Sequence, residues 1–201
     1  WPAPERLEEL VRTAAERTVS KAGLRSLRIA PLVAARARPV LDVAAAFEWG
    51  PGGCVDGVVG AEVEGEVAVE DPSISLRFKA DRIDLVADEV RAVDYKTGRP
   101  VSTAKTEKTR RDHLLAAVAC GRSLQAVSYA LAAGGVGRYL ALRPDIGGAP
   151  EAARAAEVRA DDPDLGQAFR CAVATVSEAR RLGAMFPRVE EAPKPGDLPS
   201  H

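Results

Sequence analysis

Long hydrophobic runs, histidines and paired cysteines are what this sequence lacks. No apolar segment approaches the roughly 20 residues that a membrane-spanning helix needs, so we expect no membrane partner. The three cysteines lie far apart without a CxxC pair, which fits neither a disulfide framework nor a zinc site and favours a reducing, cytoplasmic location. With only His113 and His201, a histidine-rich metal centre is excluded.

An excess of charge of either sign is missing as well. The chain has 28 Lys and Arg against 29 Asp and Glu, so any contact with a nucleic acid must come from a local patch. Three tyrosines, four phenylalanines and two tryptophans offer little for a base-stacking platform. The 201 residues, 46% of them apolar, suffice for one domain with a real core.

Apolar periodicity predicts helices first and strands after them. Helical spacing covers residues 3–19 and 28–48, and Pro39 should kink or split the second helix. Between residues 58 and 97 the period changes to two, with turns expected at Asp71-Pro72 and Ala87-Asp88-Glu89. The three strands predicted there are Val58–Glu70, Ser73–Val86 and Val90–Lys96.

The rest of the chain should add helices and two short strands. Asp112 is expected to cap one long helix that ends near Gly134-Gly135, and Asp162-Pro163 to start another that runs to Gly183. Strands are expected at Arg138–Leu142 and around Val158.

Together these elements predict an α/β layered domain in three parts. The parts are a helical segment 1–57, a core 58–186 and a Pro-rich, disordered tail 187–201. A first residue Trp1 in place of methionine leads us to expect a piece of a longer protein.

Two carboxylates and a lysine are the candidate functional residues of the predicted strands. If Ala87-Asp88-Glu89 is a three-residue loop, Asp84 and Asp94 are diagonal neighbours on one sheet face, roughly 7–8 Å apart. Lys96 shares the face of Asp94. Paired carboxylates hold a hard divalent cation, and a lysine beside it can orient water or offset charge on a phosphoryl oxygen. The pattern thus predicts phosphodiester hydrolysis; the alternative is a solvated strand whose ion pair contributes about 0–1 kcal/mol.

In the following helix Gln125 and Tyr129 stand four residues apart and share one face. Such a polar pair on an otherwise apolar face indicates a helix whose amide is turned toward something polar on the sheet. An ordinary hydrogen bond between helix and sheet is the alternative.

The segments ADRIDLV, VDYKTG and QAVSY, in this order, resemble the nuclease domain of the RecB/AddB kind in the PD-(D/E)XK superfamily, over about residues 58–135. The resemblance implies a restriction-endonuclease-like fold, with a mixed central sheet flanked by helices. It also implies that Asp84, Asp94 and the main-chain carbonyl of Tyr95 bind the metal and that Lys96 is the catalytic lysine. Gln125 and Tyr129 would then support the site or contact the DNA backbone.

The function implied is that of a Mg²⁺- or Mn²⁺-dependent DNA exonuclease module from a helicase–nuclease that processes double-strand breaks. Its partners would be DNA and the helicase domains or subunit of the parent complex. Two alternatives stay open. One is a catalytically inactive nuclease-like domain that binds DNA or braces a partner subunit. The other is an unrelated α/β domain, which Asp84 and Asp94 on opposite sheet faces would indicate.

The sequence departs from the pattern of this family in two respects. Relatives usually carry a histidine metal ligand on an upstream helix, yet residues 1–112 contain no histidine. Either that helix precedes Trp1 or the ligand is lost; Glu64 is a possible acidic substitute. Many relatives also carry a C-terminal cysteine cluster for an iron–sulfur centre, which this chain lacks.

Basic residues follow the strand that carries Lys96. A Ser/Thr/Lys-rich loop at this place could hold phosphates by charge without reading sequence, or it could merely be a mobile, solubilising loop. The residues predicted to contact DNA are Arg82, Arg99, Lys105, Lys108, Arg110 and Arg111.

Overall fold

The computed structural model describes residues 2–50, 53–69 and 74–184. The chain divides into two compact units, one of residues 1–55 with 142–145 and one of residues 56–141 with 146–201. The turn expected at Asp71-Pro72 and the tail 187–201 lie outside the described residues. None of the described helices is long and apolar enough to cross a membrane.

The first unit contains a helical hairpin. Helix α1 (Pro4–Lys21) packs along α2 (Ala30–Glu48), and the short 3₁₀ helix η1 (Arg25–Leu27) lies in the connection between them. Both predicted helices are confirmed, but α2 runs unbroken through Pro39. The helix is continuous over its 19 residues, although Pro39 removes one N–H donor and its ring crowds the preceding turn.

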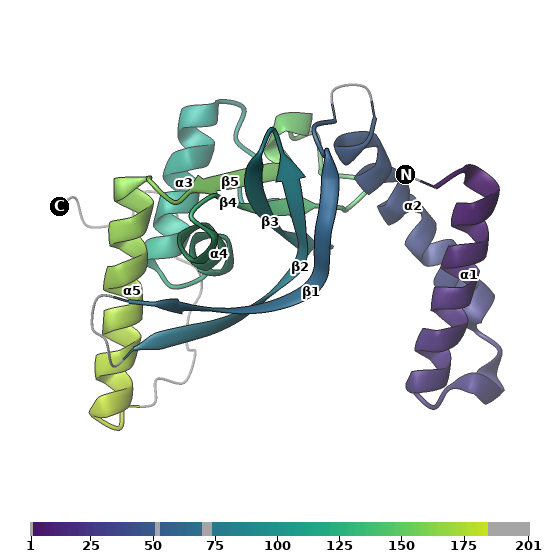
Figure 1. Ribbon diagram of the computed structural model, residues 1–201, viewed down its shortest axis with the longest axis horizontal. Helices are drawn as coiled ribbons and strands as arrows, with labels where there is room; N and C mark the ends of the chain where they lie inside the picture. Colours follow the sequence, from purple (N-terminus) through teal and green to yellow (C-terminus); the bar gives the residue numbers. More distant parts are fainter. Residues whose placement is uncertain (1, 51–52, 70–73, 185–201) are drawn as a thin grey trace. The chain divides into compact units, whose positions relative to one another are not determined.

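The second unit is built on a five-stranded mixed sheet in the order β1-β2-β3-β4-β5 (Figure 1). All neighbouring strands are antiparallel except β3 and β4, which are parallel. The mixed α/β architecture expected from the sequence is therefore confirmed. The strands are β1 (Gly57–Ala68), β2 (Ser75–Val86), β3 (Glu89–Lys96), β4 (Val136–Ala141) and β5 (Ala155–Arg159).

Two helices, in place of the single long one predicted, connect β3 to β4. Helix α3 (Glu107–Ala119) begins earlier than expected, because the Thr106 side chain, and not Asp112, accepts the N–H of Thr109 at its start. It ends at Ala119 with Cys120 as its C-cap, and Gly121 follows with a φ of 72°, the left-handed conformation that glycine adopts without strain. Helix α4 (Gln125–Ala133) then starts anew.

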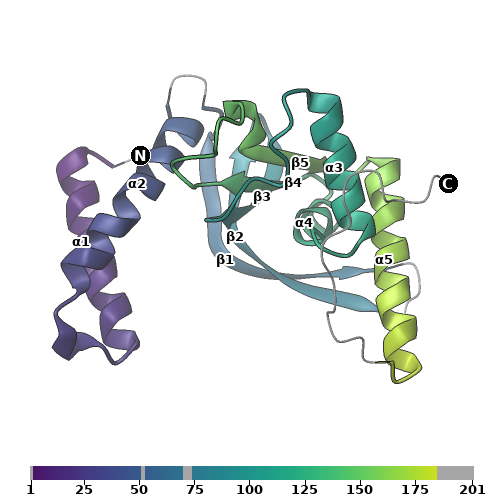
Figure 2. The same cartoon turned by 180° about the vertical axis from the view of Figure 1, so that it is seen from behind.

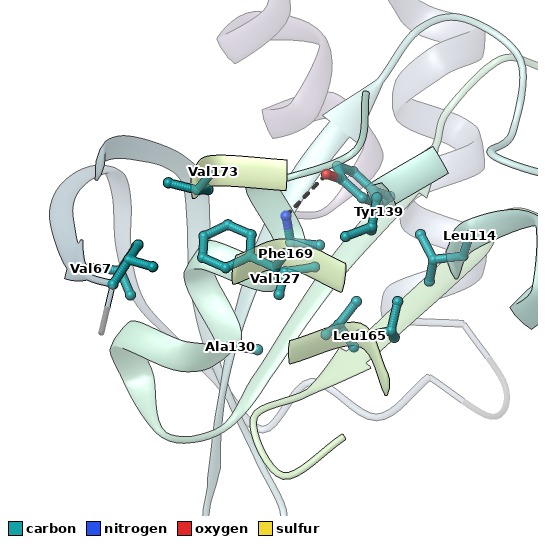
Figure 3. Packing of buried hydrophobic residues seen from close by; sticks show 12 residues of the cluster. Val67, Leu114, Val127, Ala130, Tyr139, Leu165, Phe169 and Val173 are labelled. Carbon is teal, nitrogen blue, oxygen red and sulfur yellow. Dashed lines mark hydrogen bonds between the residues drawn. The ribbon is translucent and has the colours of Figure 1, made fainter. Parts of the chain in front are cut away.

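The core lies between the sheet and three helices. Helix α4 packs against all five strands, and α5 (Pro163–Arg181) packs against α3 and α4. As predicted, Asp162 caps α5 by accepting the N–H groups of Asp164 and Leu165. Figure 2 shows these helices gathered on one side of the sheet, and Figure 3 shows Val127 and Phe169 in the buried cluster between them.

Gly137 allows the closest approach between α4 and the sheet. A Cβ atom there would collide with the main-chain oxygen of Ala126, whereas a Cβ at Gly57 meets nothing within 4 Å. We expect Gly137→Ala to lower the free energy of unfolding by about 1–3 kcal/mol or more, as overpacking does. Chemical denaturation of both variants tests this, and an equal effect of Gly57→Ala would contradict it.

Candidate active site

The turn between β2 and β3 sets which side chains meet on the sheet. It has two residues, Ala87 and Asp88, both with positive φ (48° and 66°), and Val86 pairs with Glu89. The three-residue loop expected from the sequence is therefore wrong by one position. A slip of one residue turns every side chain of a strand to the other face. Asp84 consequently pairs with Arg91 and lies on the face opposite to that of Asp94.

Strands β2 and β3 part at the point where the predicted chemistry lies. Their ladder ends at the pair Arg82–Val93, and from Asp94 onward β3 pairs only with β4. In the fork, Asp81 Oδ2 accepts a hydrogen bond from the main-chain N–H of Tyr95 (2.7 Å). The carboxylate that reaches the peptide between Asp94 and Tyr95 thus belongs to Asp81, the first aspartate of the DRID segment.

Four of the predicted residues come together beside this fork. Lys96 Nζ lies 2.5 Å from Asp94 Oδ2 and donates a hydrogen bond to Gln125 Oε1 (2.8 Å). The hydroxyl of Tyr129 donates to the main-chain oxygen of Lys79 (2.8 Å) and lies 3.3 Å from Asp94 Oδ1. Because Tyr129 is fully buried, it holds Asp94 and the sheet together and is not exposed to a nucleic acid.

Tyr139 of β4 positions the helix that supplies Gln125 and Tyr129. Its hydroxyl accepts the N–H of Ala126 in the first turn of α4 (3.1 Å), the interaction drawn dashed in Figure 3. The residue before α4, Leu124, provides no side-chain cap. Lys96 Nζ lies 5.3 Å from the centre of the Tyr139 ring, a cation–π contact. The sequence predicted the strand that contains Tyr139, but no local pattern indicated a role for its side chain.

The oxygen atoms at the fork have the chemistry of a hard-cation site. Asp94 is 4% exposed, and its buried Oδ2 contacts Lys96 only as an ion pair, without an aligned hydrogen bond. This oxygen therefore keeps a lone pair for another ligand, and Asp81 adds a second carboxylate. Among the described residues, however, no group of three or more Asp, Glu, His or Cys side chains is arranged to hold a metal ion.

Asp84 belongs to a buried ion cluster on the other face of the sheet. It is fully buried, and the guanidinium of Arg82 donates to both its oxygens, at 2.6 and 2.5 Å. Arg91 Nη2 lies 3.4 Å from Oδ2, and Arg82 also donates to the hydroxyl of Tyr95. Asp84 therefore serves as a counter-ion in the core and does not share a cation-binding face with Asp94.

The predicted DNA-contacting residues differ in their availability. Arg82 is 6% exposed and committed to Asp84, so its place in a DNA-facing surface was wrong. Arg110 donates to two carbonyls of the preceding loop, and Arg111 pairs with Asp162 and Asp164 at 3.0 Å. Lys108 pairs with Asp112. Exposed Arg99 and Lys105 have no ion-pair partner in the described part of the chain and stay predictions.

The loop that carries these basic residues is attached to α3 by hydrogen bonds. Buried Ser102 bonds His113 Nδ1 (2.8 Å) and accepts the N–H of Ala104 (3.2 Å). The loop after β3 is therefore held at both its middle and its end, where Thr106 caps the helix.

Comparison with protein families gives one match. A family model described as the PD-(D/E)XK nuclease superfamily matches residues 2–193. The searches of curated proteins and of solved structures returned no match. The family match contradicts the hypothesis of an unrelated domain. Although Asp84 and Asp94 do lie on opposite faces, Asp81 takes the place beside Asp94 that had been expected of Asp84.

Asp84 should matter for stability. Asp84→Asn removes the charge that neutralises buried Arg82, and breaking a buried ion pair from one side costs about 3–5 kcal/mol. Urea denaturation should show this loss, whereas Asp81→Asn at the fork should cost less. If both variants unfold at the urea concentration of the parent protein, the core role of Asp84 is wrong.

The tyrosines at the site should make stability depend on alkaline pH. Burial disfavours the phenolate and raises the pKa of Tyr139 to about 12; burial and the charge of Asp94 also raise the pKa of Tyr129. A raised pKa in the folded state means that stability is complete below pH 10 and is lost as the pH rises toward 12. Between pH 9 and 11 the free energy of unfolding of the parent protein, measured by urea denaturation, should therefore fall by about 1.4 kcal/mol more than that of Tyr139→Phe. Parallel losses in the two proteins would contradict this.

Proposed function

Because the chain belongs to the PD-(D/E)XK nuclease superfamily, we propose that it is a divalent-metal-dependent deoxyribonuclease whose active site lies at the fork between β2 and β3. The observation that supports this assignment best is the convergence of Asp81, Asp94 and Lys96 at one point of the sheet. The restriction-endonuclease-like fold of the superfamily, expected from the sequence, agrees with the mixed sheet and its flanking helices.

Asp81 and Asp94 would hold the ion, Mg²⁺ or Mn²⁺, with the main-chain carbonyl of Tyr95 as a further oxygen ligand. A bound ion of this kind lowers the pKa of a water ligand and polarises a phosphoryl oxygen. Asp81 replaces Asp84 in this proposal, because only Asp81 reaches the strand segment that carries Asp94.

The chain's own residues orient the reacting groups. Lys96 lies between Asp94 and Gln125, so its ammonium group is held where it can position a water or offset charge on a phosphoryl oxygen. Gln125 fixes the lysine through its amide oxygen, and Tyr129 fixes Asp94 through its hydroxyl. Both act through other residues and are positioning groups.

Several finer features remain part of the proposal. They are the RecB/AddB-like specificity, the exonuclease mode, a helicase–nuclease parent in double-strand-break repair, a cytoplasmic location, and the division into a helical segment 1–57 and a nuclease core 58–186. The order of the ADRIDLV, VDYKTG and QAVSY segments supports the RecB/AddB-like features, the three separate cysteines support the location, and the change in apolar period near residue 58 supports the division. The superfamily match supports DNA as the substrate.

One observation favours a second candidate, a catalytically inactive domain that binds DNA or braces a partner. Two carboxylates converge at the fork, but no third acidic, histidine or cysteine ligand joins them in the part of the chain that the structure describes. Glu64, considered as an acidic substitute, lies on β1. Cleavage by the isolated chain separates the two candidates.

The test is the degradation of end-labelled linear DNA with Mn²⁺ or with EDTA. Asp81→Asn and Asp94→Asn should abolish metal-dependent cleavage, because each removes a charged ligand. Lys96→Ala should lower the rate about 10²–10³-fold, as the loss of one preorganised charge-stabilising group does. Asp88→Asn is the matched control: this exposed turn residue has a φ of 66°, which asparagine tolerates, so activity should be kept.

Asp84→Asn separates the two assignments of the first metal ligand. We expect its activity per folded molecule to resemble that of the parent protein, with the loss confined to stability. Full activity of Asp81→Asn, together with an inactive and stable Asp84→Asn, would overturn the fork as the metal site. An inactive parent protein would favour the non-catalytic candidate.

A further inference from the structure

The helical hairpin of the first unit carries a concentration of positive charge that the proposed active site does not use. From residue 17 to residue 40 the chain has six basic residues and no acidic one, although the net charge of the whole chain is −1. In a nearly neutral protein such a local imbalance attracts a polyanion at those of its cations that have no carboxylate partner. The six residues are Arg17, Lys21, Arg25, Arg28, Arg36 and Arg38.

Three of these arginines line one pocket. A cavity of about 440 Å³ lies where α1 meets the connection to α2, and its lining includes Arg17, Arg25 and Arg28. Ser20 adds a hydroxyl to the lining. One carboxylate, that of Glu16, lines the pocket. It lies 3.6 Å from the guanidinium of Arg12, a residue that does not line the pocket. We refer to the cavity with Arg17, Arg25 and Arg28 as the arginine pocket.

The guanidinium groups of the arginine pocket are not neutralised by the protein. Arg17, Arg25 and Arg28 are exposed, and none of them has an ion-pair partner in residues 2–50, 53–69 or 74–184. Other arginines of the same hairpin are paired: Arg6 with Glu9 at 2.5 Å and Arg38 with Asp42 at 2.9 Å. Three unpaired like charges around one cavity repel one another, and a bound anion would relieve that repulsion.

The start of α2 adds a second favourable feature. Ala30, the first residue of this helix, also lines the pocket, and the preceding Ile29 provides no side-chain cap. Pro31 contributes no N–H here, so the uncapped N–H of Ala30 and the positive end of the helix dipole are what favour an anion at this end. The C-terminal end of α1 also faces the pocket region, and free carbonyl groups there would repel an anion. This repulsion is reduced because the N–H groups of Gly23 and Leu24 donate to the carbonyls of Ser20 and Val19.

We propose that the arginine pocket binds a phosphate group of the DNA backbone, as a second contact with the substrate apart from the proposed catalytic fork. The proposal rests on the nuclease function proposed above. Guanidinium groups match phosphate oxygens with paired hydrogen bonds, and a strand with one charge per nucleotide supplies more than one anion to three arginines. Such a contact holds the strand by charge and reads no sequence.

The test measures DNA binding without cleavage, by fluorescence anisotropy in EDTA over a range of salt concentrations. Arg17→Gln/Arg25→Gln removes two pocket charges; Arg28, whose backbone is left-handed with a φ of 52°, is left unchanged. The matched control, Arg6→Gln/Arg38→Gln, removes two charges from the same hairpin that already have carboxylate partners. Circular dichroism verifies that both variants remain folded.

For a duplex oligonucleotide, we expect the pocket variant to bind more weakly and its slope of log K against log salt to fall by about 0.9 for each lost phosphate contact. The control should keep the slope of the parent protein, and Arg17→Lys/Arg25→Lys should recover part of the affinity. Equal effects in pocket and control variants, or none in either, would overturn the proposal. So would binding of inorganic phosphate that the pocket variant loses while its DNA binding is unchanged.

Failure of the arginine pocket and failure of the nuclease function give different results. A parent protein that cleaves DNA with Mn²⁺ but whose pocket variant binds DNA normally overturns the pocket alone. A parent protein that binds DNA through the pocket but never cleaves it overturns the catalytic assignment alone.

Discussion

The two-residue turn at Ala87–Asp88 decides what the site of this protein contains. Side chains on a strand alternate between faces, so the length of this turn fixes whether Asp81 or Asp84 shares the region of Asp94. The turn needs left-handed backbone at both positions, which costs about 1–2 kcal/mol at Ala87 and less at Asp88, because aspartate adopts this conformation more readily. The carboxylate of Asp56 accepts the N–H of Ala87 and so helps to hold the conformation.

The register gives the two aspartates of the DRID segment separate roles. Residues three apart on a strand face opposite ways, and Asp81 enters the fork while Asp84 enters the core. The core cluster still acts on the fork, because Arg82 bonds both Asp84 and the hydroxyl of Tyr95. Tyr95 stands between Asp94 and Lys96 on β3, so the charges on the far face anchor the strand that presents the site.

The sequence predicted what depends on local patterns and missed what depends on long-range geometry. Periodicity located the strands, and Asp162-Pro163 located the start of α5. Asp94, Lys96, Gln125 and Tyr129, which the structure brings together, were singled out because their spacings place them on shared faces. The register between β2 and β3 was predicted wrongly, since Ala-Asp is not a recognised signature of a two-residue turn. Nor does any local pattern reveal that the hydroxyl of Tyr139 reaches the first turn of α4.

Counting basic residues also overstated the charge that is available to a nucleic acid. Lys108 and Arg111, counted beside the strand that carries Lys96, have carboxylate partners, and Arg110 is bound to main-chain carbonyls. In a chain with a net charge of −1, attraction for phosphates comes from the cations that the fold leaves unpaired. The arginine pocket concentrates three of them, and its one lining carboxylate, Glu16, forms its ion pair with Arg12. The pairing pattern, which only the folded chain defines, therefore determines where phosphate groups are attracted.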